Sequence, residues 1–232
     1  MKCKVFAVLL AAGIGSRMNS SSTKQMMRIG SYTVLERCVR AFDLCEYIDR
    51  IAIVCRAEEL KTVGEQACRI SDKVECVIIG GKTRAESAHI GFEAVKGSCD
   101  FVAIHDVARC LILPEQINAV VSAAIATGAA SATSQVFDTL KIVDSDNTLV
   151  STVDRRTVRA ASTPQVFSCN LYEQGLAACS SVENVTDDNM LMEAIGQRVV
   201  AVDVGRNNIK ITTPEDIQYA EFILDKRGEL YV

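Results

Sequence analysis

The sequence predicts an α/β protein with a Rossmann-like, mostly parallel sheet sandwiched by helices, and three observations support this fold class. Four short apolar runs recur in the first half of the chain, and a stretch with helical features follows each of them. Such continuous runs are typical of strands buried on both faces. A length of 232 residues with 49% hydrophobic residues suits one core. We therefore expect residues 1–232 to form a single domain.

The first half alternates strands and helices in a regular order. The expected strands are residues 4–10 (KVFAVLL), 50–55 (RIAIVC), 74–80 (VECVIIG) and 99–106 (CDFVAIHD). The expected helices are Thr33–Cys45, Ala57–Ile70, about Thr83–Val95, and one that Pro114 opens at its first turn. Proline is tolerated there because that N–H has no partner within the helix. This alternation indicates a parallel sheet covered on both faces.

The pattern changes between Phe137 and Phe167. This stretch offers short alternating strands, a turn at Asp144–Asn147 and no long amphipathic helix. It is much longer than an ordinary connection of about 4–6 residues, and it is patterned like a hairpin. We expect residues 138–160 to form a protruding arm used for dimerisation. A thin arm cannot bury both of its own faces, so a second subunit is its natural partner.

The last part of the chain returns to alternating elements. Helices are expected near Asn170–Ser180 and Asp187–Ile195, followed by a strand at residues 197–204 and a final helix. Thr213 can cap that helix, Pro214 occupies its first position, and the acidic residues that follow suit its N-terminal dipole.

Composition excludes several classes of protein. A net charge of −4 and a pI near 5.3 leave no global basic face for nucleic acid. No segment approaches the roughly 18 consecutive apolar residues of a membrane span. The opening MKCKVFAVLLAAG has features of a signal peptide, but it leads into a patterned glycine loop and is interpreted as a core strand.

Ten cysteines without a C-x-x-C pair argue against zinc ribbons, iron–sulfur clusters and thioredoxin-type dithiols. Scattered thiols are typical of the reducing cytoplasm.

The loop after the first strand predicts an anion site. In VFAVLLAAGIGSRMNSSSTKQ a buried strand opens into a glycine-bearing loop that carries Arg17 and Lys24. A dinucleotide fingerprint fails because Met18 stands where a third glycine is required, and because no acidic residue ends the second strand. A P-loop at GGKT fails because its first glycine would fall on Cys76, inside a strand. A nucleotide whose phosphates are bound by backbone N–H groups and the two cations fits better.

Seven motifs then occur in a specific order: LAAGIGSRM…KQ, GGKTRAES, HDVAR, DTLK, VDR…TPQVF, TDD and NIKITTPEDI. In these motifs, from about Phe6 to Phe222, the chain resembles the 2-C-methyl-D-erythritol 4-phosphate cytidylyltransferases. The resemblance implies transfer of a cytidylyl group from CTP to that polyol phosphate, with release of pyrophosphate, in the non-mevalonate isoprenoid pathway. It also implies Mg²⁺ or another divalent cation, and a homodimer whose sites are shared through the arm.

The resemblance assigns roles to particular residues. Its catalytic residues are Arg17, Lys24 and Lys210. Its nucleotide-binding residues are Ala11, Ala12, Gly13, Gly15, Gly80, Gly81, Ser87 and Asp106. Its polyol phosphate site comprises Asp106, Arg109, Thr139, Arg155, Thr163 and Thr186. Asp106 is the expected metal ligand, since it ends a strand and Mg²⁺ takes one or two carboxylates together with substrate phosphates.

Some positions depart from the family or stay open. Thr23 and Cys110 replace prolines that are usual in the family, which suggests a more mobile loop and a modest change in the position of Arg109. His105 is interpreted as structural, because no partner histidine lies nearby in sequence, and Arg156 as solvent-facing. Asp203, at a strand end, is a candidate for a second magnesium ligand.

Two other functions are compatible with part of this pattern. Ribitol-5-phosphate cytidylyltransferases of wall polymer synthesis share the loop, the lysines and NIKITTP, but they tend to LAGG and HDAVR in place of the LAAG and HDVAR of this chain. A non-catalytic nucleotide-binding regulator would not need the full set of Arg17, Lys24, Asp106 and Lys210.

Overall fold

One twisted sheet organises the fold. The computed structural model describes residues 3–13, 23–179 and 185–231, so Gly15 and Arg17 lie outside the described residues. Within those ranges the sheet has seven strands in the order β11-β7-β10-β6-β1-β4-β5. The strands are β1 (Val5–Leu10), β4 (Arg50–Cys55), β5 (Val74–Ile79), β6 (Phe101–Asp106), β7 (Ala129–Gln135), β10 (Arg159–Ser168) and β11 (Val200–Asp203). Neighbours are parallel, except that β10 runs antiparallel to β6 and β7.

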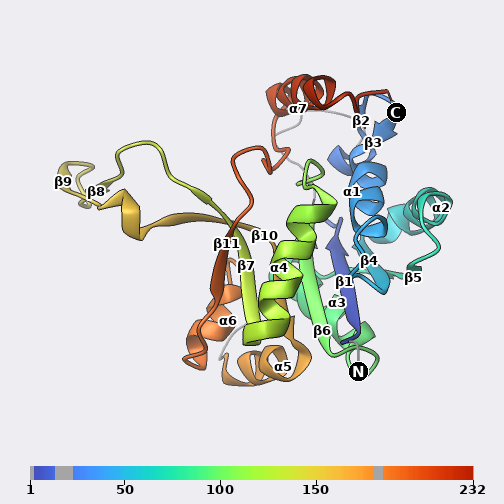
Figure 1. Ribbon diagram of the computed structural model, residues 1–232, viewed down its shortest axis with the longest axis horizontal. Helices are drawn as coiled ribbons and strands as arrows, with labels where there is room; N and C mark the ends of the chain where they lie inside the picture. Colours follow the sequence, from blue (N-terminus) through green and yellow to red (C-terminus); the bar gives the residue numbers. More distant parts are fainter. Residues whose placement is uncertain (1–2, 14–22, 180–184, 232) are drawn as a thin grey trace.

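Helices cover both faces of this sheet (Figure 1). They are α1 (Val34–Asp43), α2 (Leu60–Ile70), α3 (Arg84–Val95), α4 (Pro114–Thr127), α5 (Cys169–Ala178), α6 (Asn189–Ala194) and α7 (Pro214–Arg227). The 3₁₀ helices η1 (Lys24–Met26), η2 (Ala57–Glu59) and η3 (Arg155–Thr157) and the short strands β2 (Arg28–Ile29), β3 (Tyr32–Thr33), β8 (Lys141–Val143) and β9 (Leu149–Thr152) complete the described part.

Strand β1 shows why the sheet is buried on both sides. Val5, Ala7 and Leu9 pack in a core that includes side chains of α1, α2, α4 and α7. The alternate residues, Phe6 and Val8 among them, pack in a second core with side chains of α3, α5 and α6. Successive side chains of a strand point to opposite faces, so a strand between two helical layers must be apolar throughout. The expected α/β class and mostly parallel sheet are confirmed.

The expected helices and the turn are also present, with small differences at their ends. The stretch Ala57–Ile70 begins as η2 and continues as α2. The backbone N–H of Asn147 donates to the carbonyl of Asp144 at 3.1 Å, which closes the expected turn. Asn147 has a φ of 59°, a conformation that asparagine tolerates better than most residues.

The segment from Phe137 to Phe167 is only partly what its pattern predicted. Strands β8 and β9 form a hairpin that projects well away from the sheet (Figure 1). TPQVF, however, lies in β10, whose residues Ser162–Phe167 are buried between β6 and β7. The prediction of short strands throughout this stretch was therefore wrong at its C-terminal end. Strand β7 was not predicted, because its sequence, AASATSQ, consists mostly of small and polar residues with weak strand preference.

No helix in the described ranges is long and apolar enough to cross a membrane.

Candidate active site

A pocket of about 280 Å³ opens at the C-terminal ends of β1 and β6. The two strands are parallel neighbours, and their last residues, Leu10 and Asp106, are paired in register. The lining residues are Leu10, Ala11, Ala12, Gly13, Lys24, Gln25, Gly81, Lys82, Thr83, Arg84, Ser87, Asp106, Val107, Ala108 and Lys210. Ligands of open α/β sheets bind at this edge. The structure thus brings together four separate motifs at one place.

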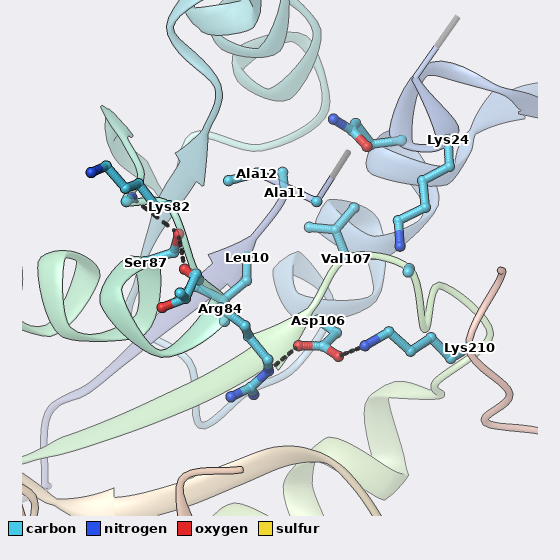
Figure 2. A pocket seen from close by; sticks show the side chains of 15 residues that line it. Leu10, Ala11, Ala12, Lys24, Lys82, Arg84, Ser87, Asp106, Val107 and Lys210 are labelled. Carbon is cyan, nitrogen blue, oxygen red and sulfur yellow. Dashed lines mark hydrogen bonds and ion pairs between the residues drawn. The ribbon is translucent and has the colours of Figure 1, made fainter. Parts of the chain in front are cut away.

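Asp106 lies between two cations (Figure 2). Its Oδ1 accepts a hydrogen bond from Nε of Arg84 at 2.9 Å, and its Oδ2 accepts one from Nζ of Lys210 at 2.7 Å. Burial alone would raise the pKa of this carboxyl, but Arg84 and Lys210 outweigh it and hold the pKa well below its usual range. Asp106 is therefore ionised at every pH at which the protein would be assayed.

A second carboxylate, that of Asp188, fixes the orientation of Arg84. Its Nη1 donates to Oδ2 of Asp188 at 2.8 Å, and the side chain of Asp188 is only 2% exposed. Asp188 also accepts from the hydroxyl of Tyr172 at 2.7 Å, and its backbone N–H donates to the side-chain carbonyl of Gln165 at 2.9 Å. Burial would lower the pKa of Arg84, but Asp188 and Asp106 raise it overall. Arg84 is thus a permanent cation held in one orientation.

A second set of contacts supports the backbone of Asp106. Its N–H donates to Oγ1 of Thr163 at 3.1 Å, and the same oxygen lies 3.0 Å from Nδ1 of His105. His105 is fully buried beside the ring of Phe42. Burial lowers its pKa to about 3, so the imidazole is neutral. His105 does not line the pocket, in agreement with the structural interpretation. Thr163 is also buried and does not line it, so its contact with Asp106 is indirect support.

The opposite wall of the pocket is built on close backbone packing. The Ser87 hydroxyl donates to the carbonyl of Thr83 at 2.9 Å and accepts from the N–H of Gly81 at 3.2 Å. A Cβ on Gly80 would stand 2.7 Å from this hydroxyl oxygen and 3.0 Å from Cβ of Ala12. Only glycine therefore lets the loop after β5 come this close to β1. Gly80 packs behind this wall without lining the pocket, whereas Gly81 and Ser87 line it.

The described end of the loop after β1 brings Lys24 into the pocket (Figure 2). A Cβ on Gly13 would lie 3.5 Å from Cε of Lys24, which shows how closely the two ends of the loop approach. The hydroxyl of Thr23 and the side-chain amide of Gln25 both bind the carboxylate of Glu59, the latter at 2.7 Å. Thr23, where the family usually has proline, is therefore anchored by a hydrogen bond in place of a ring.

The other residues expected at the polyol phosphate site do not line this pocket. Arg109 is partly buried and donates to the carbonyl of Asn208 at 2.9 Å, which joins the loop after β6 to the segment before Lys210. Arg155 donates to the carbonyl of Phe137 at 2.6 Å, at the base of the arm. Thr139 and Thr186 are exposed. Within one chain, the hairpin of β8 and β9 lies well apart from the C-terminal ends of β1 and β6 (Figure 1).

Asp203 and Arg156 lie outside the pocket and bind other groups of the protein. Asp203 accepts from Nε2 of Gln135 at 3.1 Å and from the N–H of Gly205 at 2.9 Å, and it does not line the pocket. Arg156 pairs with its neighbour Asp154, and its side chain is 86% exposed, as expected. Among the described residues, no three or more histidine, cysteine, aspartate or glutamate side chains are grouped to hold a metal ion.

Comparison with known proteins identifies the family. The profile of the 2-C-methyl-D-erythritol 4-phosphate cytidylyltransferase family matches residues 5–226. The chain belongs to this family. The curated cytidylyltransferase of Caldanaerobacter subterraneus subsp. tengcongensis is 38% identical over 96% of this chain and 99% of its own length. The cytidylyltransferase of Lachnospira eligens is 35% identical over 94% of this chain and 98% of its own length.

Solved structures agree with the sequence relatives. The crystal structure of the 4-diphosphocytidyl-2C-methyl-D-erythritol synthase from Anaerococcus prevotii superposes with a TM-score of 0.85, at 28% identity, over 97% of each chain. The expected family, the cytidylyltransferase class and the place in the non-mevalonate isoprenoid pathway are therefore confirmed. The family match favours methylerythritol phosphate over ribitol phosphate as acceptor.

Sequence reasoning missed Arg84 and Asp188 as site residues. Arg84 stands inside GGKTRAES, between the glycines and the serine that were assigned, and its position at the start of α3 was the available signal. Asp188 belongs to TDD, of which only Thr186 was assigned.

Proposed function

We propose that the pocket binds CTP with its cytosine against the Gly81–Ser87 wall and its triphosphate between Lys24 and Lys210. One observation supports this proposal above all. On one side of the pocket the buried carboxylate of Asp106 is held between Arg84 and Lys210, and the opposite wall presents hydrogen-bonding groups of the backbone and of Ser87. The phosphate of 2-C-methyl-D-erythritol 4-phosphate then attacks the α-phosphorus of CTP. The bond from that phosphorus to the bridging oxygen breaks, and pyrophosphate leaves.

The hydrogen bonds of Ser87 support recognition of cytosine. Its single hydroxyl proton goes to Thr83, and the N–H of Gly81 occupies one oxygen lone pair. The hydroxyl therefore offers a ligand only an acceptor. The 4-amino group of cytosine can donate to it, whereas the carbonyl of uracil cannot.

Charge neutralisation supports the phosphate side of the proposal. A phosphate monoester must approach a triphosphate, and little is required of the protein beyond positioning and cancelling this repulsion. Lys24 and Lys210 enter the pocket from different elements, and Arg84 adds a third cation. Arg17, outside the described residues, is proposed to act on the same phosphates because it stands on the same loop as Lys24.

We propose Mg²⁺ at Asp106, and the donor set fits it. Mg²⁺ commonly takes one or two carboxylates and completes its shell with water and substrate phosphates. The two oxygens of Asp106 bind Arg84 and Lys210, but a carboxylate has about four lone-pair positions, so it can accept a cation beside them. The ion would supply further positive charge to the triphosphate oxygens.

We propose that the arm completes the site of a second subunit in a homodimer. Apolar side chains lie exposed on it or, for Phe137, at its base: Phe137, Leu140, Ile142, Val143, Leu149 and Val150. An isolated two-stranded hairpin with such a surface needs a partner to cover it. Thr139 and Arg155 stand on this arm, away from the pocket of their own chain, so a partner's pocket is the place where they would meet substrate phosphate.

Pyrophosphate release with CTP and Mg²⁺ tests the acceptor directly. Methylerythritol 4-phosphate and ribitol 5-phosphate are offered side by side at equal concentrations. Turnover with the first and little with the second supports the proposal, and the reverse preference makes the chain a ribitol phosphate enzyme. CTP binding without release of pyrophosphate with either acceptor contradicts the proposed reaction and favours a nucleotide-binding regulator.

A further inference from the structure

Two cysteines that are far apart in sequence meet in space. None of the ten cysteines is joined in a disulfide, and the sequence pairs none of them in a C-x-x-C motif. The sulfur atoms of Cys99 and Cys169 nevertheless lie 3.4 Å apart, at a sequence separation of 70 residues. Nothing in the cytidylyltransferase site uses them, since neither lines the pocket.

The antiparallel pairing of β10 with β6 creates this contact. Ser168, the last residue of β10, is opposite Phe101, the first residue of β6. The pairing extends by one more residue on each strand, because the N–H of Cys169 donates to the carbonyl of Asp100 at 2.9 Å. The pairing of the two strands therefore brings together Cys99, just before β6, and Cys169, just after β10. Asp106 stands at the opposite end of β6, so the thiol pair and the pocket are at opposite edges of the sheet.

The two thiols are not equivalent. Both residues are partly buried and pack against the core formed with α3, α5 and α6, so neither is sealed inside the protein. The hydrogen bond with Cys169 lowers the pKa of Cys99 although burial opposes the shift, while the same bond and burial raise the pKa of Cys169. These directions favour Cys99 as the attacking thiolate and Cys169 as the resolving thiol.

We propose that Cys99 and Cys169 form a reversible intramolecular disulfide when the protein meets a small-molecule disulfide such as oxidised glutathione. The Cys99 thiolate attacks one sulfur of the reagent and forms a mixed disulfide, and the other half of the reagent leaves as a thiolate. Cys169 loses its proton to solvent and attacks Sγ of Cys99, which expels the second half. Two protein thiols are oxidised, and one disulfide is reduced to two thiols.

Geometry favours the second step over a lasting mixed disulfide. The resolving sulfur is already in contact with the attacked one, so its effective concentration exceeds that of any free thiol. The product joins the segment just before β6 to the start of α5 and closes a long loop of chain, which reduces the entropy of the unfolded state. The oxidised protein should therefore unfold several degrees higher than the reduced protein. Excess free thiol reverses the reaction.

The experiment treats the reduced full-length Cys68→Ser protein with oxidised glutathione, and Cys68 is removed because it is exposed on α2. After acid quenching, remaining thiols are alkylated and the digest is analysed by mass. The expected product is a cross-linked pair of peptides containing Cys99 and Cys169, two hydrogens lighter than their sum, with a higher melting temperature that falls again on reduction.

Single-cysteine variants distinguish the attacking thiol from the resolving thiol. Cys169→Ser should stop the reaction at a glutathione adduct on Cys99, whereas Cys99→Ser should leave Cys169 mostly alkylated. The matched control is Cys76→Ser, which removes another partly buried thiol of the same core and should leave the cross-link intact. Recovery of Cys99 and Cys169 as alkylated thiols or as two separate adducts overturns the proposal. An unchanged or lower melting temperature of the oxidised protein overturns the stabilising role.

Discussion

The guanidinium of Arg84 donates to Asp188 at 2.8 Å through one nitrogen and to Asp106 at 2.9 Å through another. A buried carboxylate thus orients the cation that faces the proposed metal ligand. The connection joins the neighbouring elements α3 and β6 to the start of α6, which lies about 80 residues further along the chain than β6.

Replacing Asp188 tests this connection. In Asp188→Asn the charge that holds Arg84 is lost, so we expect kcat to fall by about 10- to 100-fold, the usual cost of losing a residue that orients a ligand. Tyr172→Phe removes only the hydrogen bond to Asp188 and should have a smaller effect in the same direction. Asp72→Asn, which changes an exposed carboxylate outside the pocket, is the matched control. Urea midpoints are measured in parallel, and a folded Asp188→Asn enzyme with normal kcat contradicts the positioning role.

Lys24 is expected to act on charge that develops in the transition state. Lys24→Ala should lower kcat by about 10²–10³, the cost of one preorganised donor, with less effect on KM for CTP. Lys61→Ala removes an exposed lysine of α2 and should leave turnover unchanged. Steady-state pyrophosphate release measures both variants. Turnover of Lys24→Ala within twofold of wild type would refute the proposed role.

Base selectivity should depend on Ser87. The wild-type enzyme should prefer CTP to UTP strongly in kcat/KM, because uracil would leave the acceptor oxygen of Ser87 opposed to a carbonyl. Ser87→Ala removes this oxygen and should reduce the preference, mostly through a loss with CTP. Competition between the two nucleotides at fixed acceptor concentration measures the ratio. Equal kcat/KM values in the wild type would show that this wall does not read the base.

His105 should make the protein less stable in mild acid. Its pKa is about 3 when folded, against about 6.5 in an unfolded chain, so below pH 6.5 the unfolded state binds a proton that the native state does not. Stability is therefore full above the unfolded pKa and declines as pH falls towards the folded value. At pH 5.5 this one group should cost about 1.4 kcal/mol relative to neutral pH.

Urea unfolding from pH 7.5 to 5.5 checks the histidine. His105→Asn cannot titrate and should lose less stability over this range than the wild type. His89→Asn, which removes the other histidine of the chain, serves as the control and should follow the wild type. Parallel pH curves for the wild type and His105→Asn would show that this imidazole does not titrate on unfolding.

Mixing two inactive variants tests the shared site. If Arg155 reaches the partner's pocket, Lys24→Ala and Arg155→Ala homodimers should both be nearly inactive. A heterodimer of the two has one site with both defects and one with neither. Statistical exchange gives about half heterodimers, so about a quarter of wild-type activity should return. Exchange confirmed by mass without any return of activity would place Arg155 in the site of its own chain.

Local pattern was enough for much of the fold and for the position of the site. The apolar runs of β1, β4, β5 and β6 each mark a strand buried on both faces, and the stretches between them form helices close to the expected bounds. Because the carboxyl ends of parallel strands share an edge, the positions of Lys24 and Asp106 in the sequence already pointed to one pocket.

Tertiary structure decided the features that have no local signature. The insertion of β10 between β6 and β7 depends on pairing across the sheet, and the weakly patterned β7 is a strand because its neighbours bury it. Arg84 and Asp188 are 104 residues apart, and Cys99 and Cys169 are 70 apart. The sequence by itself determined which segments become strands and helices, since that follows from side-chain periodicity. Only the folded chain decided which distant side chains meet, since that follows from strand order and register.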